Sequence, residues 1–176
     1  MILVPSQTLA VISAYPDGQC DPSIIGFLAE HGFLLDESHL VVANVRVNDV
    51  VVNHNTIIGK VFLPSKMEHL LFIEKDIGLG QFTELFLEDV RDVVCVKFNT
   101  GRRQSWLSDG FHTGMFRTRR EVLQKVTPPW FMTEYSQDGT AVVKCLCMHF
   151  ADKARAAGFT VGNAGLAHHT PKSFSC

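Results

Sequence analysis

The chain has 176 residues, of which 46% are hydrophobic and 19% are charged, and its formal net charge is −2. This length fits one domain and suffices to bury about two thirds of the unfolded surface in one core. The composition excludes an intrinsically disordered protein, and the charge gives no global argument for nucleic-acid binding. No apolar run reaches the roughly 18 residues that a membrane helix needs, so we expect no membrane insertion.

Cysteine usage and the amino-terminal residues indicate a reducing compartment. The five cysteines are an odd number, and Cys145 and Cys147 are too closely spaced for an easy structural bridge. Segment 1–16 is apolar, but it lacks a basic start and contains Pro5, so it resembles a first core strand rather than a signal peptide. We therefore expect a cytoplasmic protein.

Strands and helices are predicted to alternate along the first half of the chain. Apolar, β-branched runs predict strands at 8–14, 39–47, 69–73 and 92–98. Apolar residues at helical spacing, with their caps and stops, predict helices at 22–31, 55–63 and 81–90, the last after a turn at 78–80. This order indicates an α/β fold with a mostly parallel sheet flanked by helices.

The second half has fewer regular signals. Segment 99–110 shows no strong period and reads as a loop. A capping box of Thr118 and Glu121 predicts a helix at 119–126, and a last helix is predicted at 145–157, followed by an extended segment that leads to His168 and His169. The chain shows no internal repeat and no linker, so we expect a single domain over residues 1–176.

Basic residues gather between Lys97 and Lys125. This stretch has seven basic residues against Asp109 and Glu121. Two interpretations stay open: a solvated face of a loop and a helix start, or a surface that binds phosphates or a polyanionic acceptor.

Two acidic residues, Glu74 and Asp76, follow a buried strand. Carboxylates separated by one residue can both reach a hard cation such as Mg²⁺ or Mn²⁺ if the backbone turns there. Ligands of parallel sheets bind beyond the carboxyl ends of strands. An exposed turn is the ordinary alternative. His168 could join the carboxylates on Mn²⁺, although paired histidines near a chain end are more often exposed to solvent.

Other catalytic patterns find little support. Cys145, Cys147 and His149 invite a zinc or redox interpretation, but residues two apart on a helix point to different sides and no second cysteine pair follows. We therefore expect structural thiols. The sequence has no Gly-x-Ser-x-Gly elbow and no glycine-rich phosphate loop of either common pattern.

Four segments carry a resemblance to a known family, in the same order over nearly the whole chain. They are "NHNTIIGKVFL" (53–63), "HLLFIEKDIG" (69–78), "TGMFRTRREVLQKVTPPWF" (113–131) and "ADKARAAGFTVGNAGLAHH" (151–169). They resemble, in turn, an Arg-Asn-containing helix, a strand that ends in Asp-x-Asp, a Thr-Gly-Phe segment that ends in Pro-Pro-Trp-Phe, and a helix with an Ala-Gly-Phe turn and a terminal metal-binding His. These are features of nucleotide-sugar-dependent glycosyltransferases of the GT-A fold, in particular the short bacterial and phage proteins of the family-2-like group.

The resemblance implies a GT-A-like (Rossmann-like) domain that transfers a sugar from a nucleotide-diphosphate donor with Mn²⁺ or Mg²⁺. Residues 1–98 would form the nucleotide- and metal-binding half, and residues 99–176 the acceptor half. The acceptor would be a glycan, a small molecule or modified DNA. The metal would lie on Glu74, Asp76 and His168. Substrate contacts would come from Ala14, Tyr15, Pro16, Asp17, Asn55, Lys97, Thr113, Gly114, Arg117 and Trp130.

One departure from the family pattern concerns the general base. Members of the group have Glu-Asp some twelve residues before the Gly-Phe turn, and Leu146 and Cys147 stand there in this chain. A thiol is a poor substitute for a carboxylate as base. Three explanations stay open: Asp138 or Glu134 supplies the base; the transfer retains configuration and needs none; or the protein is a catalytically silent binder of nucleotide sugars or nucleic acid.

Overall fold

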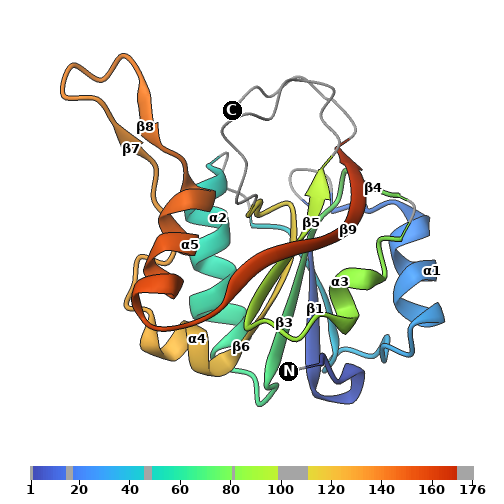
Figure 1. The fold of residues 1–176 in the computed structure, drawn as a ribbon. Coiled ribbons are helices and arrows are strands. Elements are labelled where there is room, and N and C mark those ends of the chain that lie inside the picture. The colour runs from blue at the N-terminus through green and yellow to red at the C-terminus, as the bar shows by residue number, and fades with distance from the viewer. Residues whose placement is uncertain (1, 15–17, 46–48, 81, 99–110, 170–176) are drawn as a thin grey trace.

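The computed structural model describes residues 2–14, 18–45, 49–80, 82–98 and 111–169. A seven-stranded sheet has helices on both faces, and a two-stranded hairpin projects from the body (Figure 1). The sheet has the order β2-β1-β3-β6-β5-β9-β4. Its strands are β1 (Thr8–Ser13), β2 (Leu40–Ala43), β3 (His69–Glu74), β4 (Ile77–Leu79), β5 (Val93–Phe98), β6 (Met115–Arg119) and β9 (Val161–His169); the hairpin consists of β7 (Glu134–Tyr135) and β8 (Val142–Lys144).

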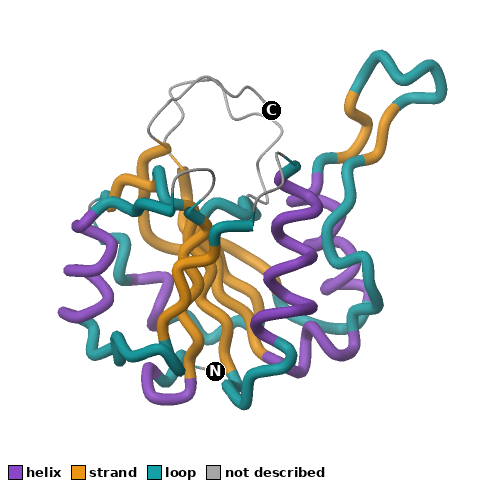
Figure 2. The backbone as a smooth tube through the Cα atoms, turned by 180° about the vertical axis from the view of Figure 1, so that it is seen from behind, coloured by secondary structure: helices purple, strands orange, loops and turns teal. Residues whose placement is uncertain are grey.

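The helices cover the sheet from both sides (Figure 2). They are η1 (Pro5–Gln7), α1 (Pro22–Glu30), α2 (Val50–Thr56), η2 (Ile57–Phe62), α3 (Leu85–Glu88), α4 (Arg120–Lys125) and α5 (Leu146–Ala156). One core cluster lies between the sheet and α1 with α3, and a second lies between the sheet and η2 with α4 and α5. Both faces of the sheet are therefore buried, which is why its strands read as continuous apolar runs.

Five strands of the sheet share one direction. β1 pairs in parallel with β2 and β3, and β5 pairs in parallel with β9. β6 runs antiparallel between β3 and β5, and β4 runs antiparallel to β9. The predicted α/β fold with a mostly parallel sheet flanked by helices is confirmed. β6 and β9, from the second half of the chain, belong to the same sheet as β1–β5.

Local signals placed the first helix correctly. The Asp21 carboxylate accepts a hydrogen bond of 2.9 Å from the Ser23 N–H, and Pro22 takes the first helical position. Ile24 and Leu28, one turn apart, are fully buried against the sheet. The end at Glu30, before Gly32 with its positive φ, matches the predicted stop within one residue.

The second helix begins earlier than predicted. The Asp49 carboxylate caps α2 by accepting from the N–H groups of Val51 and Val52 at 2.8 and 3.1 Å. The predicted segment 55–63 covers the end of α2 and the π-helix η2, in which the apolar residues are buried. The polar run Asn53 to Asn55 interrupts the apolar period, which is why the pattern alone missed the first two turns.

Three further predictions were wrong. The expected turn at 78–80 is not formed, because Gly78 and Leu79 belong to strand β4 and Gly80 directly follows it. Within the expected helix at 81–90, the described residues form only the four-residue helix α3. Thr118 belongs to β6, where it pairs with Leu70 of β3, so it does not cap α4. The pairing of Thr118 with β3 therefore takes the place of the predicted capping box.

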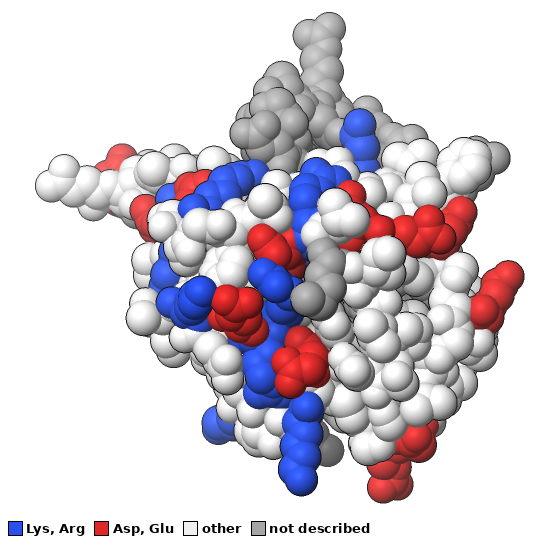
Figure 3. Space-filling view, turned by 60° about the horizontal axis from the view of Figure 1, so that its bottom comes forward, with Lys and Arg blue, Asp and Glu red and all other residues white. Residues whose placement is uncertain are grey.

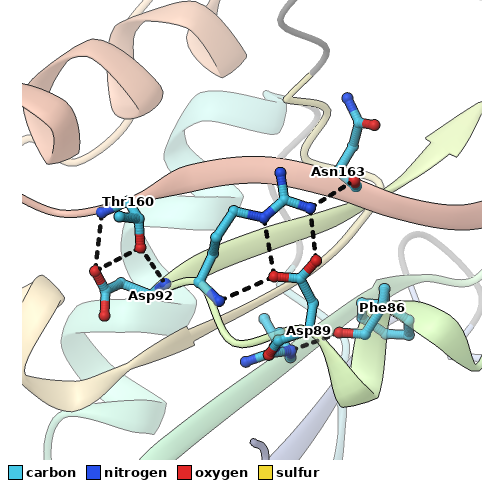
Figure 4. A network of polar contacts seen from close by, with 7 residues as sticks. Phe86, Asp89, Asp92, Thr160 and Asn163 are labelled. Atoms are coloured by element: carbon cyan, nitrogen blue, oxygen red, sulfur yellow. Dashed lines mark hydrogen bonds and ion pairs between the residues drawn. The ribbon is translucent and has the colours of Figure 1, made fainter. Parts of the chain in front are cut away.

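An ion-pair network fastens β9 to the segment that joins α3 to β5 (Figure 4). The Arg91 guanidinium donates to both oxygens of Asp89 at 2.9 and 2.6 Å and to the Asn163 carbonyl at 2.8 Å. The Asp92 carboxylate accepts from the N–H and the hydroxyl of Thr160, each at 2.8 Å. A Cβ on Gly162 would lie 1.7 Å from an Arg91 nitrogen, so glycine leaves the room that the guanidinium fills.

Arg117 lies inside the protein, not at a donor site. Its side chain is 1% exposed, its Nε donates to the Phe86 carbonyl at 2.6 Å, and an Nη atom donates to the Asp89 carbonyl. Burial lowers the pKa of Arg117 to about 10, which leaves the group charged at neutral pH. Arg117 therefore ties α3 to β6, and the expectation that it contacts a donor diphosphate is corrected.

The other described cations of the basic stretch are largely engaged as well. Arg119 pairs with Asp92 at 2.5 Å, and Lys125 pairs with Glu121 at 2.9 Å. The Arg120 guanidinium donates to four backbone carbonyls, those of Phe62, Leu63, Ser65 and Met67. Figure 3 shows acidic side chains interspersed with the basic ones on the lower face. These residues stabilise the fold, whereas Arg102 and Arg103 lie outside the described residues.

We predict that Arg117→Met lowers the free energy of unfolding by about 2–4 kcal/mol, because two buried carbonyl groups lose their donors. Urea denaturation measures this change. Lys125→Met, which removes an exposed pair, is the matched control and should change stability by less than about 1 kcal/mol. An Arg117→Met protein as stable as the wild type would contradict the structural role.

Candidate functional site

The order of the strands locates the candidate site. The chain leaves β1 through α1 on one face to reach β2, and it returns through α2 and η2 on the other face to reach β3 on the opposite side of β1. In such sheets ligands bind outside the carboxyl ends of the strands, at the point where the order reverses. The last paired residues at that point are Ser13 of β1 and Glu74 of β3.

Four polar residues meet there, and we call Ser13, Asn53, His54 and Glu74 the switch-point cluster. The Asn53 amide donates to the Ser13 hydroxyl at 2.7 Å, and a Glu74 carboxylate oxygen lies 3.7 Å from His54 Nε2. Asn53 and His54, which both belong to α2, are buried although their side chains are polar. Sequence reasoning missed both; the signal was a run of three polar residues inside an otherwise apolar helical segment.

Two atoms of the switch-point cluster are unusual for a protein interior. Within the described residues, Asn53 Oδ1 and His54 Nε2 are buried and have no hydrogen-bond partner. Burial lowers the pKa of His54, so its ring is neutral at pH 7. Its Nδ1–H donates to the Val50 carbonyl at 2.7 Å, which leaves Nε2 as an acceptor. Unpaired buried acceptors at a strand end suit a ligand that brings hydroxyl or amide donors.

The acidic residues and His168 lie at the same edge of the sheet. β4 pairs antiparallel with β9, so Gly78 stands opposite His168. Ile77, Leu79 and Ala167 pack into the cluster beside α1, which places Gly78 and His168 on the other face. Alternation along β3 puts Glu74 on this second face too, because Phe72 belongs to the second core cluster. Asp76 lies half-buried in the turn between β3 and β4.

The side chains of Glu74, Asp76 and His168 are of the types that bind a hard cation, but they do not form a complete metal-binding site. Two carboxylates and an imidazole suit Mn²⁺. In the part of the chain that is described, however, no three His, Cys, Asp or Glu side chains come together to hold a metal ion. The Glu74 carboxylate is turned toward His54. An ion at this edge would therefore need additional oxygen ligands, as Mg²⁺ and Mn²⁺ take from substrate phosphates and water.

Thr113 and Gly114 connect the switch-point cluster to α5. The Gly114 carbonyl accepts from the Glu74 N–H at 2.7 Å, and Thr113 is the neighbouring residue in the chain. The Thr113 hydroxyl lies 3.6 Å from Cys147 Sγ in the first turn of α5. The structure thus brings together four residues predicted from the sequence: Glu74, Thr113, Gly114 and Cys147.

Asn55 and Trp130 have structural roles instead. Asn55 Oδ1 accepts from the N–H groups of Trp130 and Phe131 at 2.9 and 3.1 Å, and its amide donates to the Phe131 carbonyl at 2.8 Å. The buried Trp130 indole donates to the Leu123 carbonyl at 2.9 Å. Both residues hold the segment after Pro129 against α2 and η2, and neither side chain is available to a ligand.

The remaining predicted contacts fall into three groups. Lys97 is exposed near the carboxyl end of β5, and because Val96 and Phe98 face the core beside α1, it lies on the same face as His168. Ala14 is buried at the end of β1. Tyr15, Pro16 and Asp17 lie outside the described residues.

The three candidate bases differ in their surroundings. The neighbouring Cys145 thiol and burial raise the pKa of Cys147 well above its ordinary value. Hydrogen bonds from Ser136 and Thr140 lower the pKa of Asp138, in the turn of the hairpin, to about 2, so it is a poor proton acceptor. Glu134 pairs in β7 with Lys144, just before α5, and its carboxylate lies 3.2 Å from His149 Nδ1. Of the two acidic candidates, Glu134 is placed nearer to the first turn of α5.

A shallow hollow of about 170 Å³ lies at the opposite edge of the sheet. Leu3, Pro5 and Phe33 line it beside the amino end of β1, together with Glu84 and Glu88. This hollow does not adjoin the switch-point cluster, so we do not assign the predicted site to it.

Comparison with known proteins supports the fold alone. No family model matches the chain, and no curated protein matches it. The crystal structure of A197 from STIV is similar, with a TM-score of 0.56 and 17% sequence identity over 92% of this chain and 83% of that one. No described helix has the length and apolar character that crossing a bilayer requires.

We predict that two neighbouring asparagines of α2 respond differently to substitution. Asn55→Ala should lower the free energy of unfolding by about 2–4 kcal/mol, because it leaves two N–H groups and a carbonyl without partners. Asn53→Ala removes one hydrogen bond and should cost about 1 kcal/mol. Urea denaturation of both variants measures the difference, and equal losses would contradict these roles.

Proposed function

We propose that the chain is a metal-dependent glycosyltransferase that moves a sugar from a nucleotide-diphosphate donor to an acceptor hydroxyl. One observation supports the proposal: β4 pairs with β9, so that Gly78, two residues after Asp76, stands opposite His168. Carboxylates after β3 and an imidazole from much later in the chain, at the same edge of the sheet, agree with the family resemblance of the sequence. This edge, at the carboxyl ends of the parallel strands, is where such sheets bind ligands.

Asp76 and His168, with Glu74, would hold the cation in this proposal. A divalent ion there would neutralise the diphosphate and make it a better leaving group. Lys97 lies on the same face and would add positive charge toward the phosphates. The free acceptors Asn53 Oδ1 and His54 Nε2 would take hydrogen bonds from donor hydroxyl groups.

We assign the general base to Glu134. Transfer with inversion needs a group that removes the proton of the acceptor hydroxyl. The carboxylate of Glu134 is 42% exposed, and the His149 Nδ1–H orients it at 3.2 Å. Asp138 is the weaker candidate because its pKa of about 2 makes it a poor base at neutral pH.

The acceptor is better described as a glycan or small-molecule hydroxyl than as modified DNA. Phosphate-backbone binding needs several cations that can face the nucleic acid. The described arginines of the basic stretch contact carbonyls or carboxylates instead. Lys97 alone is exposed toward the candidate site among the described cations of that stretch.

A silent nucleotide-sugar-binding protein is the second candidate function. The observation in its favour is that Cys147, buried and protonated, occupies the place of the usual carboxylate base. In that case the switch-point cluster would bind a donor without transferring its sugar.

We predict that the wild-type protein binds a nucleotide-diphosphate sugar in the presence of Mn²⁺ and that Asp76→Asn weakens this binding at least tenfold, because the cation loses a charged ligand. Calorimetry with a panel of UDP-, GDP-, ADP- and dTDP-hexoses measures it. Asp138→Asn, an identical change in the exposed hairpin, is the control and should bind as the wild type does. Equal affinity of Asp76→Asn and the wild type would contradict the assignment.

We predict that Glu134→Gln lowers kcat about 10²- to 10⁴-fold, the usual contribution of a general base, while donor affinity stays constant. Release of nucleoside diphosphate from the donor identified by calorimetry measures turnover, again with Asp138→Asn as control. Donor binding by the wild type with no turnover on varied acceptors would favour the silent alternative instead.

A further inference from the structure

The hollow beside the amino end of β1 is lined by apolar residues from three separate parts of the chain. Leu3 comes from the amino-terminal segment, Phe33 from the chain after α1, and Leu87 from α3. All three side chains are buried and belong to the core cluster beside α1. The lining of the hollow is therefore built on the packed core.

Two carboxylates at the hollow meet no described lysine or arginine there. Glu84 is the N-cap of α3 and Glu88 is its last residue, and both line the hollow. The Glu84 side chain makes no cap hydrogen bond. Among the described residues, His31 is the only other titratable group of the lining. Like charges four residues apart on a helix repel each other, so a cation beside both carboxylates would be favourable.

The size of the hollow indicates what kind of occupant it suits. Sites for cofactors and other small molecules usually have volumes of about 300 Å³ or more. The hollow, at about 170 Å³, is smaller and suits one long side chain.

Exposed apolar residues accompany the hollow. Ile2 lines it and is exposed, and Leu34 and Leu85, the chain neighbours of the lining residues Phe33 and Glu84, are exposed as well. Exposed apolar residues near a small pocket are typical of surfaces that bind another protein.

We propose that the hollow receives an arginine side chain of a partner protein. The guanidinium group binds the carboxylates of Glu84 and Glu88, and the methylene stem packs on the apolar lining. Apolar residues that flank the arginine in the partner cover Ile2 and Leu85. The inference is independent of the proposed glycosyl transfer.

Arginine fits this surface better than lysine does. A guanidinium group carries five N–H donors in a flat fork, so it can bind two carboxylates at once. An ammonium group is more strongly hydrated and therefore loses more when it leaves water.

The occupant belongs to a different protein rather than to a second copy of this chain. The described arginines already bind carboxylates or carbonyls of their own chain. A free guanidine compound would satisfy the two carboxylates but would leave the exposed apolar residues uncovered.

The test uses the full chain and the peptide acetyl-Gly-Leu-Arg-Leu-Gly-amide in amide NMR titrations. We expect saturable shifts at Leu3, Phe33 and Leu87. The same peptide with citrulline, which has the shape of arginine without its charge, should bind at least tenfold more weakly. No shift at these residues up to about 10 mM peptide would overturn the proposal.

Charge variants locate the contact. The double variant Glu84→Gln, Glu88→Gln should bind the arginine peptide at least tenfold more weakly, because the guanidinium loses both charged acceptors. Glu121→Gln, the same change at an exposed position of α4, is the control and should bind as the wild type does. Unchanged affinity of the double variant would refute the assignment.

Two further measurements distinguish the partner protein from other occupants. Agmatine, a free alkyl guanidine, should bind more weakly than the peptide, and sedimentation of the protein alone should show a monomer. Agmatine that binds as tightly as the peptide would assign the hollow to a small cation. A dimer that Glu88→Arg abolishes would assign it to a second copy, and either result would overturn the proposal.

Discussion

The antiparallel pairing of β4 with β9 is the constraint on which the candidate site depends. A three-residue strand has little stability of its own, and here it is held by close backbone packing. A Cβ on Gly80 would lie 2.8 Å from the Leu166 carbonyl, and one on Gly165, whose φ is +72°, would lie 2.5 Å from the Phe82 carbonyl. The Thr83 hydroxyl accepts from the Gly80 N–H at 2.9 Å and donates to the Leu166 carbonyl. Glycine at these positions lets β9 approach Gly80 and the backbone of Phe82 and Thr83 closely.

This pairing gives the polar end of the sheet its composition. Residues separated by about ninety positions in the sequence, Gly78 and His168, become neighbours, and the turn with Asp76 is drawn to the edge where β1 and β3 end. Beneath it, α2 places Asn53 and His54 against the strand ends, with acceptors that the described protein groups leave unpaired. The Thr113 hydroxyl lies 3.6 Å from Cys147 Sγ in the first turn of α5.

The sequence predicted the elements whose signals are local and failed where tertiary contacts decide. The apolar runs of β1, β3 and β5 and the Asp21 cap of α1 sufficed to place those elements. β6 was missed because its middle holds Arg117, a charge that the interior accepts only because the Phe86 and Asp89 carbonyls meet it. For the site, a turn rich in charge after an apolar strand led to Glu74 and Asp76 as cation ligands, and their role stays a prediction. Arg117, Asn55 and Trp130 look like ligand contacts in the sequence, and only their burial and partners identify them as structural.

The central claim is that Asp76 and His168 share a cation with a nucleoside diphosphate. Anomalous diffraction from crystals grown with Mn²⁺ and a nucleoside diphosphate tests it most directly. The account predicts an Mn²⁺ peak bonded to the Asp76 carboxylate, the His168 imidazole and diphosphate oxygens. A diphosphate bound elsewhere, or an Mn²⁺ peak remote from both residues, would contradict it.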